Sequence, residues 1–282
     1  MNHTRRRGFA LDKSHLSIDG RALSDYAVFA TADGISLGEA KPATAFTPAP
    51  GRDGGYDTTL DGRHGYPAVG RRTITVRVAA TGDPLQIEEA KALIGATAGR
   101  HVAFGGLTGL GAFRGRLTVG AWTDATGPDG RTAWSVCELT LAAEPFAYGH
   151  AERIELKPGG APTPMLVKGN RPAPLVFHQL VEEHVDNVPA HTVTHTFAET
   201  NGPRICVENT LTGAGLWDPA HELTIDCERH ETTWRGTRIP IRIDDDYFTL
   251  KPGKTSLTGL LAPTGHVASY TQYVTYEPRW LI

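Results

Sequence analysis

The amino-acid sequence predicts a mostly β protein that contains one α-helix and folds as two domains. Glycine and proline, 32 and 19 residues of 282, are spread along the chain and supply a turn signal every few residues. Between these turns, short runs alternate apolar and polar residues, as half-buried strands do. The length suits two cores of ordinary size, because domains most often contain about 100–150 residues.

The first elements are two short strands within residues 8–31, turned at Asp19-Gly20. Residues 33–70 follow and are rich in glycine and proline but poor in apolar residues. A segment of this length inside a compact domain is usually functional, so we interpret it as an arm that reaches a partner. The alternative interpretation is a mobile surface loop. Residues 71–79 then alternate as a half-buried strand.

The one predicted helix begins after Asp83, which can accept hydrogen bonds as the N-cap residue. Pro84 occupies the first helical position, and Gln86 stands where a capping box needs it. The apolar residues that can share one face of this helix are Leu85, Ala92 and Leu93. Strands are expected again at residues 101–104, 113–123 and 132–142, and a new strand pattern begins at Ile154.

Composition excludes several classes of protein. The chain is 40% hydrophobic and 21% charged, within the globular range, and its formal net charge is −3. Neither half has the basic excess of a nucleic-acid-binding protein. No apolar run approaches the roughly 20 residues of a membrane span, and Arg5–Arg7 is not followed by the apolar core of an export signal. Three cysteines indicate no disulfide framework.

Residues that could carry chemistry do not form a recognisable site, so we predict no enzyme, no cofactor and no metal. Four histidines gather in one window: His178, His184, His191 and His195. In a strand, His191 and His195 stand roughly 13 Å apart, too far to share one zinc ion. The run Asp244–Asp246 lacks the ligand spacing of a calcium loop. No P-loop and no nucleophile elbow are present.

Several blocks, in order along the chain, resemble the distal tail protein family of siphophages. The block Pro50-Gly-Arg-Asp-Gly-Gly-Tyr-Asp57 matches the family's Pro-Gly-x-x-Gly-x-x-Asp signature. Further matches are Pro145–Tyr148, Gly169–Phe177, Leu223–Asp226, Tyr247–Leu257 and Tyr276–Ile282. One departure is Lys254, where many relatives have Asn. The resemblance places the domain boundary near residue 150.

The resemblance implies a tail-tube-like β-barrel or sandwich with one helix in residues 1–150, and a galectin-like or carbohydrate-module-like β-sandwich in residues 151–282. It implies a ring, usually of six copies, that joins the tail tube to the host-recognition tip. Expected partners are further copies, the tail tube protein and a tip or receptor-binding protein. The expected location is the virion tail tip, after assembly in the host bacterial cytoplasm. The residues expected to contact the next subunit are Pro50, Gly51, Arg52, Asp53, Tyr56 and Asp57.

A second interpretation is a carbohydrate-binding module that touches the host cell wall through the second domain. Exposed aromatic rings stack on sugars, and Trp217 lies in a Gly-rich loop, so it is the expected glycan contact. Three further tryptophans, Trp122, Trp134 and Trp280, lie in strand patterns and are expected in the core.

Overall fold

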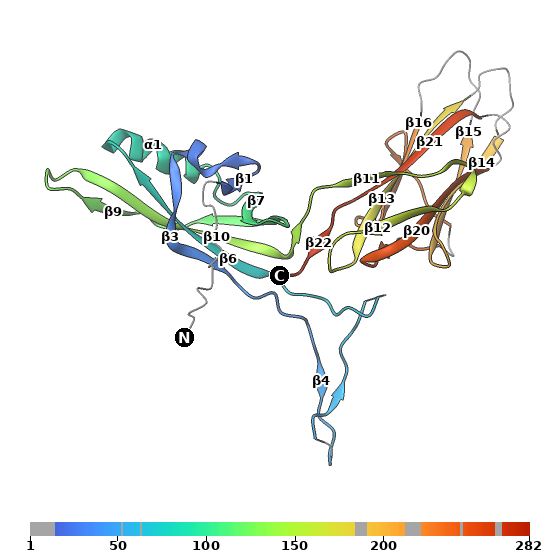
Figure 1. The fold of residues 1–282 in the computed structure, drawn as a ribbon, viewed down its shortest axis with the longest axis horizontal. Helices are drawn as coiled ribbons and strands as arrows, with labels where there is room; N and C mark the ends of the chain where they lie inside the picture. Colours follow the sequence, from blue (N-terminus) through green and yellow to red (C-terminus); the bar gives the residue numbers. More distant parts are fainter. Residues whose placement is uncertain are drawn as a thin grey trace, which may run out of the picture. The chain divides into compact units, whose positions relative to one another are not determined.

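The computed structural model describes residues 15–51, 53–62, 64–183, 191–211, 221–242, 245–262 and 267–282. These residues form β-strands and a single α-helix (Figure 1), which confirms the predicted mostly β fold. The chain divides into two compact units. Unit 1 contains Met1–Tyr148 and Trp280–Ile282, and unit 2 contains Gly149–Arg279. Unit 2 is therefore inserted in the sequence of unit 1.

Unit 1 is built on one nine-stranded sheet. Its strand order is β2-β1-β7-β8-β10-β6-β3, and β9 and β22 also pair with β10. The bounds are β1 (Ser17–Ile18), β2 (Arg21–Ala22), β3 (Val28–Leu37), β6 (Arg72–Thr81), β7 (His101–Thr108), β8 (Gly111–Val119), β9 (Thr123–Thr126), β10 (Thr132–Tyr148) and β22 (Arg279–Trp280). A short 3-10 helix, η2 (Leu23–Tyr26), follows β2.

The unit 1 core follows from the alternation of β6. Ile74, Val76 and Val78 are buried on one face, and the residues between them are exposed or half-buried. In the antiparallel register with β10, Val76 lies opposite Leu139 and Ile74 opposite Leu141. Apolar pairs of this kind stabilise a sheet through cross-strand packing.

Helix α1 (Pro84–Gly95) begins with the predicted capping box. Gln86 N–H donates to Asp83 Oδ1 at 2.9 Å, and Asp83 N–H donates to Gln86 Oε1 at 3.0 Å. The face that packs on the core differs from the expected one, because it consists of Ile87, Ala90 and Ile94. These three follow the i, i+3, i+7 spacing of a continuous helical stripe, whereas Leu85 and Leu93 are exposed.

Unit 2 is a β-sandwich with one shared core. The larger sheet, called sheet E here, contains β11 (Glu152–Glu155), β21 (Val267–Tyr276), β13 (Ala173–Glu183), β16 (His221–Asp226), β17 (Glu231–Trp234), β18 (Thr237–Arg238) and β19 (Thr249–Leu250). The smaller, called sheet F, contains β12 (Thr163–Val167), β20 (Gly253–Ala262), β14 (His191–Glu199) and β15 (Arg204–Leu211). A short 3-10 helix, η3 (Pro158–Gly160), lies between β11 and β12. Phe177 of sheet E and Phe197 of sheet F meet with their ring centroids 4.7 Å apart.

The tryptophans are placed partly as expected. Trp122 and Trp280 are partly buried against the unit 1 core. Trp134 is 44% exposed, so its predicted burial was wrong. The register between β9 and β10 shifts beside Trp134, and this irregularity breaks the simple alternation on which the prediction relied. Within the described residues, no helix is long and apolar enough to cross a membrane.

Candidate functional site: the exposed arm

The arm is a ribbon that leaves the unit 1 sheet between β3 and β6. Because residues 35–37 pair with β6, the ribbon begins at residue 38 rather than at the expected residue 33, and it returns to the sheet at residue 72. Figure 1 shows β4 (Phe46–Thr47) in this ribbon, and β4 pairs antiparallel with β5 (Tyr56–Asp57).

Backbone hydrogen bonds hold the two sides of the arm together along much of its length. Gly70 N–H donates to Lys41 O at 2.9 Å near the base, and Thr58 N–H donates to Ala45 O at 2.8 Å beside β4. The turn between β4 and β5 requires glycine at residue 55, where φ is 68° and a Cβ atom would lie 2.6 Å from Thr47 O. The arm therefore has a defined backbone without a core of its own.

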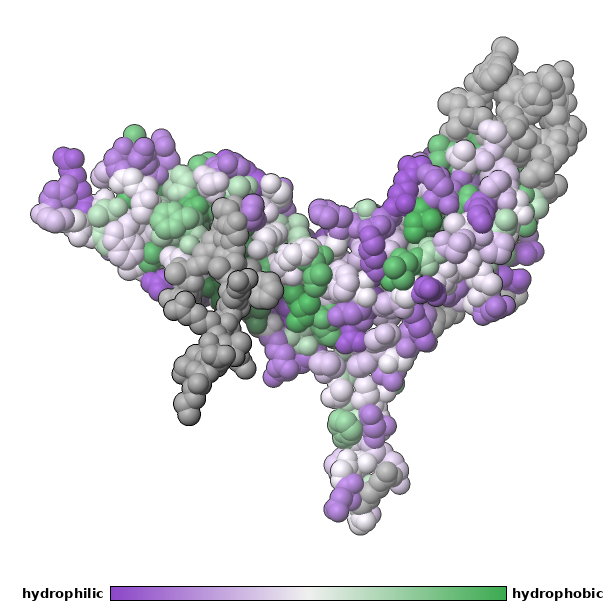
Figure 2. Space-filling model, viewed as in Figure 1, coloured by the Kyte–Doolittle hydropathy of each residue, from purple (hydrophilic) through white to green (hydrophobic). Residues whose placement is uncertain are grey.

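The arm exposes large apolar side chains. Phe46 is 61% exposed, Tyr56 is 55% exposed and Leu60 is 87% exposed. Among the described arm residues, Ala40 is the only buried one. Figure 2 shows hydrophobic surface on this otherwise polar ribbon. Three large apolar side chains are thus in contact with solvent on a segment of about 30 residues.

The two aromatic side chains project from opposite faces of the ribbon. Phe46 is paired with Asp57, and Tyr56 is paired with Thr47. Directly paired residues point to the same side of a ribbon, and neighbours along a strand point to opposite sides. One flat surface therefore covers only one of the two rings.

Asp57 shapes the arm locally. Its Oδ1 atom accepts a hydrogen bond from Thr59 N–H at 2.9 Å. Hydrogen bonds from the Thr59 side chain and then from its backbone lower the pKa of Asp57 below its ordinary value. Thr59 Oγ1 in turn accepts a hydrogen bond from Ala45 N–H at 3.0 Å. This bond links the turn that begins at Asp57 to the opposite side of the arm.

Comparison with known proteins shows which solved structures share the fold of this chain. No protein-family profile and no curated protein matches the chain. Among solved structures, it matches the crystal structure of SPP1 Dit, which is described as a paradigm of the hub adsorption apparatus in phages that infect Gram-positive bacteria. The match covers 95% of this chain and 99% of that chain, with a TM-score of 0.63 and 15% sequence identity. This chain has the Dit fold.

A second match is weaker. The phage P2 baseplate in its activated conformation gives a TM-score of 0.38 at 9% identity, covering 93% of this chain and 97% of that chain. That score is too low to support an argument. The Dit fold nevertheless agrees with the family resemblance that the sequence motifs indicate.

On this Dit fold, the predicted contact residues lie at the tip of the arm and in β5. The described ones are all exposed: Pro50, Gly51, Asp53, Tyr56 and Asp57. Arg52 lies outside the described residues. Sequence reasoning missed Phe46 and Leu60, whose exposure is the strongest feature of the arm. The available signal was an apolar residue standing alone in a Gly/Pro-rich segment.

Two histidines of the predicted window, His178 and His195, do not share a site. His178 lies on sheet E, where its Nδ1 atom is 2.7 Å from Glu222 Oε1, and His195 is fully buried in the sandwich core. His184 lies outside the described residues, as does Asp244 of the acidic run. Within the part of the chain that the structure describes, no cluster of three His, Cys, Asp or Glu side chains is arranged to hold a metal ion.

The three cysteines are free and buried. Burial raises the pKa of Cys137 to about 11 and that of Cys227 to about 12. Both thiols therefore stay protonated at neutral pH and are poor nucleophiles.

Trp217, the predicted glycan contact, lies outside the described residues. On the outer face of sheet E, Tyr273 is covered on both sides of its ring. His178 stacks on it with centroids 4.5 Å apart, and the Arg153 guanidinium carbon lies 3.6 Å from the ring centroid. Two groups so close to one ring must occupy opposite faces, so Tyr273 has no free face for a sugar.

Proposed function

We propose that this chain is a structural phage tail-tip protein of the distal tail family, and that its copies form a ring of six through their arms. The observation that carries the proposal is the arm, a defined ribbon with exposed aromatic rings on both faces. Its occurrence on a Dit fold supports the family assignment.

The arm needs a partner for a physical reason. An isolated two-stranded ribbon is marginally stable in water, and here it has no helix or sheet packed on it within the described residues. A ring of identical subunits uses head-to-tail contacts, in which one patch meets a different patch on the next copy. An arm that extends from one copy to the next supplies one side of such a contact.

Aromatic residues on both faces make the contact more specific. We infer that the ribbon lies between two surfaces, so that Phe46 is covered from one side and Tyr56 from the other. Buried aromatic residues carry a large share of interface energy.

The remaining parts of the proposal follow from the family. The ring joins the tail tube protein to a tip or receptor-binding protein, it is a virion component assembled in the host bacterial cytoplasm, and it needs no catalysis, nucleic acid or membrane. The carbohydrate-binding alternative keeps Trp217 as its proposed contact, and Tyr273 does not add to it because both faces of its ring are covered.

Deletion of residues 45–65 tests the proposal. This deletion leaves the Ala43–Ala68 hydrogen bond at the base of the arm, so unit 1 is expected to fold. We expect a folded monomer by light scattering, with an unchanged circular dichroism spectrum apart from the lost ribbon. A ring that persists after the deletion would show that the arm is not the contact.

A further inference from the structure

The outer face of the unit 1 sheet carries an apolar row that crosses three strands. In the register, Phe29 of β3 and Val136 of β10 lie on either side of Ala79 of β6. Directly paired residues share one face of a sheet, and the neighbours of Ala79 along β6, Val78 and Ala80, are buried in the core on the other face. The row therefore faces away from the core.

Two large side chains on this outer face are in contact with solvent. Phe29 is 51% exposed, and Trp134, two residues before Val136 on β10, is 44% exposed. Ala79 presents only a methyl group between their strands. Helix α1 does not cover them, because its buried residues join the core on the opposite face. We call Phe29, Ala79, Trp134 and Val136 the sheet patch.

The arm of the same copy does not cover the sheet patch, since Phe46 and Phe29 are both exposed in one chain. The arm leaves β3 and β6 beyond the pair of Leu37 with Ile74, whereas the patch lies at the pair of Phe29 with Ala79. On β6 these pairs are separated by about 17 Å at the usual rise of a strand. Arm and patch thus lie toward opposite ends of the same two strands, as the two sides of a head-to-tail contact can.

The charges beside the arm's Phe46 and beside the sheet patch are complementary. On the arm, Asp57 is paired with Phe46 and so lies on the same face of the ribbon. On the sheet, Arg77 is exposed and stands two residues before Ala79 on β6, so it flanks the patch on the same face. Glu138 lies opposite Arg77 on β10, but no ion pair of Arg77 is seen among the described residues. Arg77 is therefore available to a carboxylate of another copy.

We propose that the arm of one copy docks on the sheet patch of the next copy, with Phe46 covering the apolar row and Asp57 meeting Arg77. This inference rests on the proposed ring and gives the arm its acceptor surface. It also assigns one of the two surfaces that cover the ribbon, because Tyr56 faces away from Phe46 and Asp57. Complementary charges at the edge of an apolar contact fix its register and exclude wrong partners.

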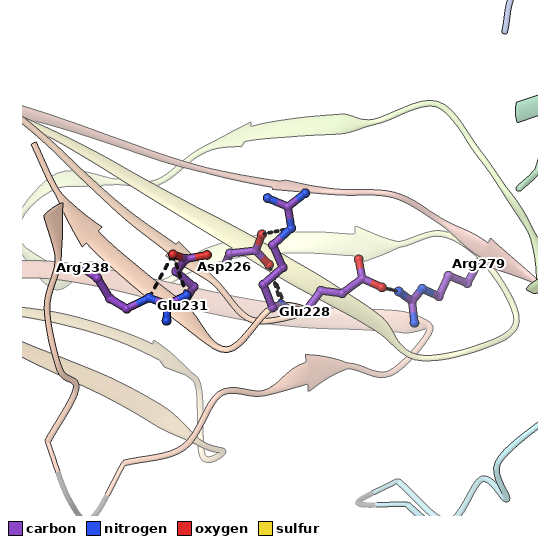
Figure 3. A network of polar contacts seen from close by, with 6 residues as sticks. Asp226, Glu228, Glu231, Arg238 and Arg279 are labelled. Atoms are coloured by element: carbon purple, nitrogen blue, oxygen red, sulfur yellow. Dashed lines mark hydrogen bonds and ion pairs between the residues drawn. The ribbon is translucent and has the colours of Figure 1, made fainter. Parts of the chain in front are cut away.

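Charge reversal in the full chain tests the charged pair, with dissociation constants from sedimentation over a concentration series. Arg77→Glu and Asp57→Arg should each weaken association by about tenfold or more, because each places like charges together. The double variant should return to within about threefold of the wild type. Arg238→Glu is the control, since Arg238 is an exposed arginine of unit 2 that pairs with Glu231 at 2.8 Å (Figure 3). A double variant as weak as the single ones would overturn the pairing.

The apolar half of the contact has its own variants. Phe29→Ser should weaken association as much as Phe46→Ser does, by about tenfold or more. The two changes together should be little worse than either alone, because they remove the same contact. Leu166→Ser is the control, since Leu166 is 58% exposed but lies on sheet F of unit 2. Unchanged urea midpoints show that all of these proteins stay folded, and fully additive losses would overturn the shared contact.

The outcomes separate this docking site from the proposed ring. Association that needs Phe46 but not Phe29 or Arg77 overturns the docking site and leaves the arm as the ring contact. Association that needs Phe29 but not Phe46 shows that another segment of the next copy covers the sheet patch, which also overturns the proposal. Association that survives deletion of residues 45–65 overturns the arm as the ring contact as well.

Discussion

The Nδ1 atom of His195 lies 2.5 Å from Oε1 of Gln179, and this contact joins the two sheets of unit 2 inside their shared core. The chain of hydrogen bonds continues from Gln179 Nε2 to Gln272 Oε1 at 3.0 Å. Gln272 Nε2 then donates to Gly259 O and to Lys157 O, each at 2.8 Å. Since Gln179 Oε1 can only accept a hydrogen bond, His195 donates to it through a proton on Nδ1.

Acid weakens unit 2 through His195. Burial lowers the pKa of His195 from 6.5 to about 4, and its Nε2 atom is buried without a partner among the described residues. Between these two values the unfolded chain binds a proton that the folded chain does not. The free energy of unfolding therefore falls as the pH drops from 6.5 to about 4, by roughly 3 kcal/mol in total.

Urea unfolding of the wild type and of His195→Gln, compared at about pH 7.5 and about pH 5, measures this linkage. The wild type should lose more stability on acidification than the variant. His178→Gln is the control, because His178 lies on the sheet surface with Glu222. An identical pH dependence for wild type and His195→Gln would contradict the assignment.

Gly259 is required by the same network. A Cβ atom there would lie 2.5 Å from Gln272 Oε1, so Gly259→Ala must displace the Gln272 amide and break its bond to Gln179. We expect a loss of roughly 2 kcal/mol or more in the free energy of unfolding. Gly95→Ala is the matched control, since no atom lies within 4 Å of its added methyl group. A Gly259→Ala protein with the unfolding midpoint of the wild type would disprove this.

Asp245 caps one backbone N–H group on the β15 edge of sheet F. Its side chain is 2% exposed, and its Oδ2 atom accepts from Cys206 N–H on edge strand β15 at 2.7 Å. Asp245→Ala leaves that N–H without its acceptor, so we expect a loss of about 1–3 kcal/mol and easier edge-to-edge association. Urea unfolding and light scattering measure both effects. Glu89→Ala on the exposed side of α1 should change neither, and a stable, monodisperse Asp245→Ala protein would refute the prediction.

Association of the copies through the arm should depend on both aromatic residues of the arm. Phe46→Ser and Tyr56→Ser are each expected to weaken association by about tenfold or more while the units stay folded, because the rings project from opposite faces. Leu85→Ser is the control, since Leu85 is 69% exposed but lies on α1. Sedimentation over a concentration series gives the dissociation constants. If only one aromatic variant weakens association, the ribbon is covered on a single face.

Local signals in the sequence predicted the fold class and the helix. The capping box of Asp83 and Gln86 needs only residues three apart, and the buried row of β6 needs only alternation within one strand. The face of α1 could not be predicted in this way, since the packed stripe depends on where the sheet lies.

Contacts between residues far apart in the chain could not be predicted from the sequence. Arg72 and Ile282 are 210 positions apart, and Gln179 and Gln272 are 93 apart, so no local pattern links them. The arm was predictable as a segment from its glycines and prolines. The placement of Phe46 and Tyr56 on opposite faces required the register of β4 and β5.

The mass and shape of the purified intact chain decide whether it assembles as proposed. Six copies of the 30.3 kDa chain give a ring of roughly 180 kDa. We predict that light scattering finds this mass and that negative-stain images show closed rings. A particle that stays at 30.3 kDa at every concentration, with and without the tail tube protein, would contradict the proposed ring.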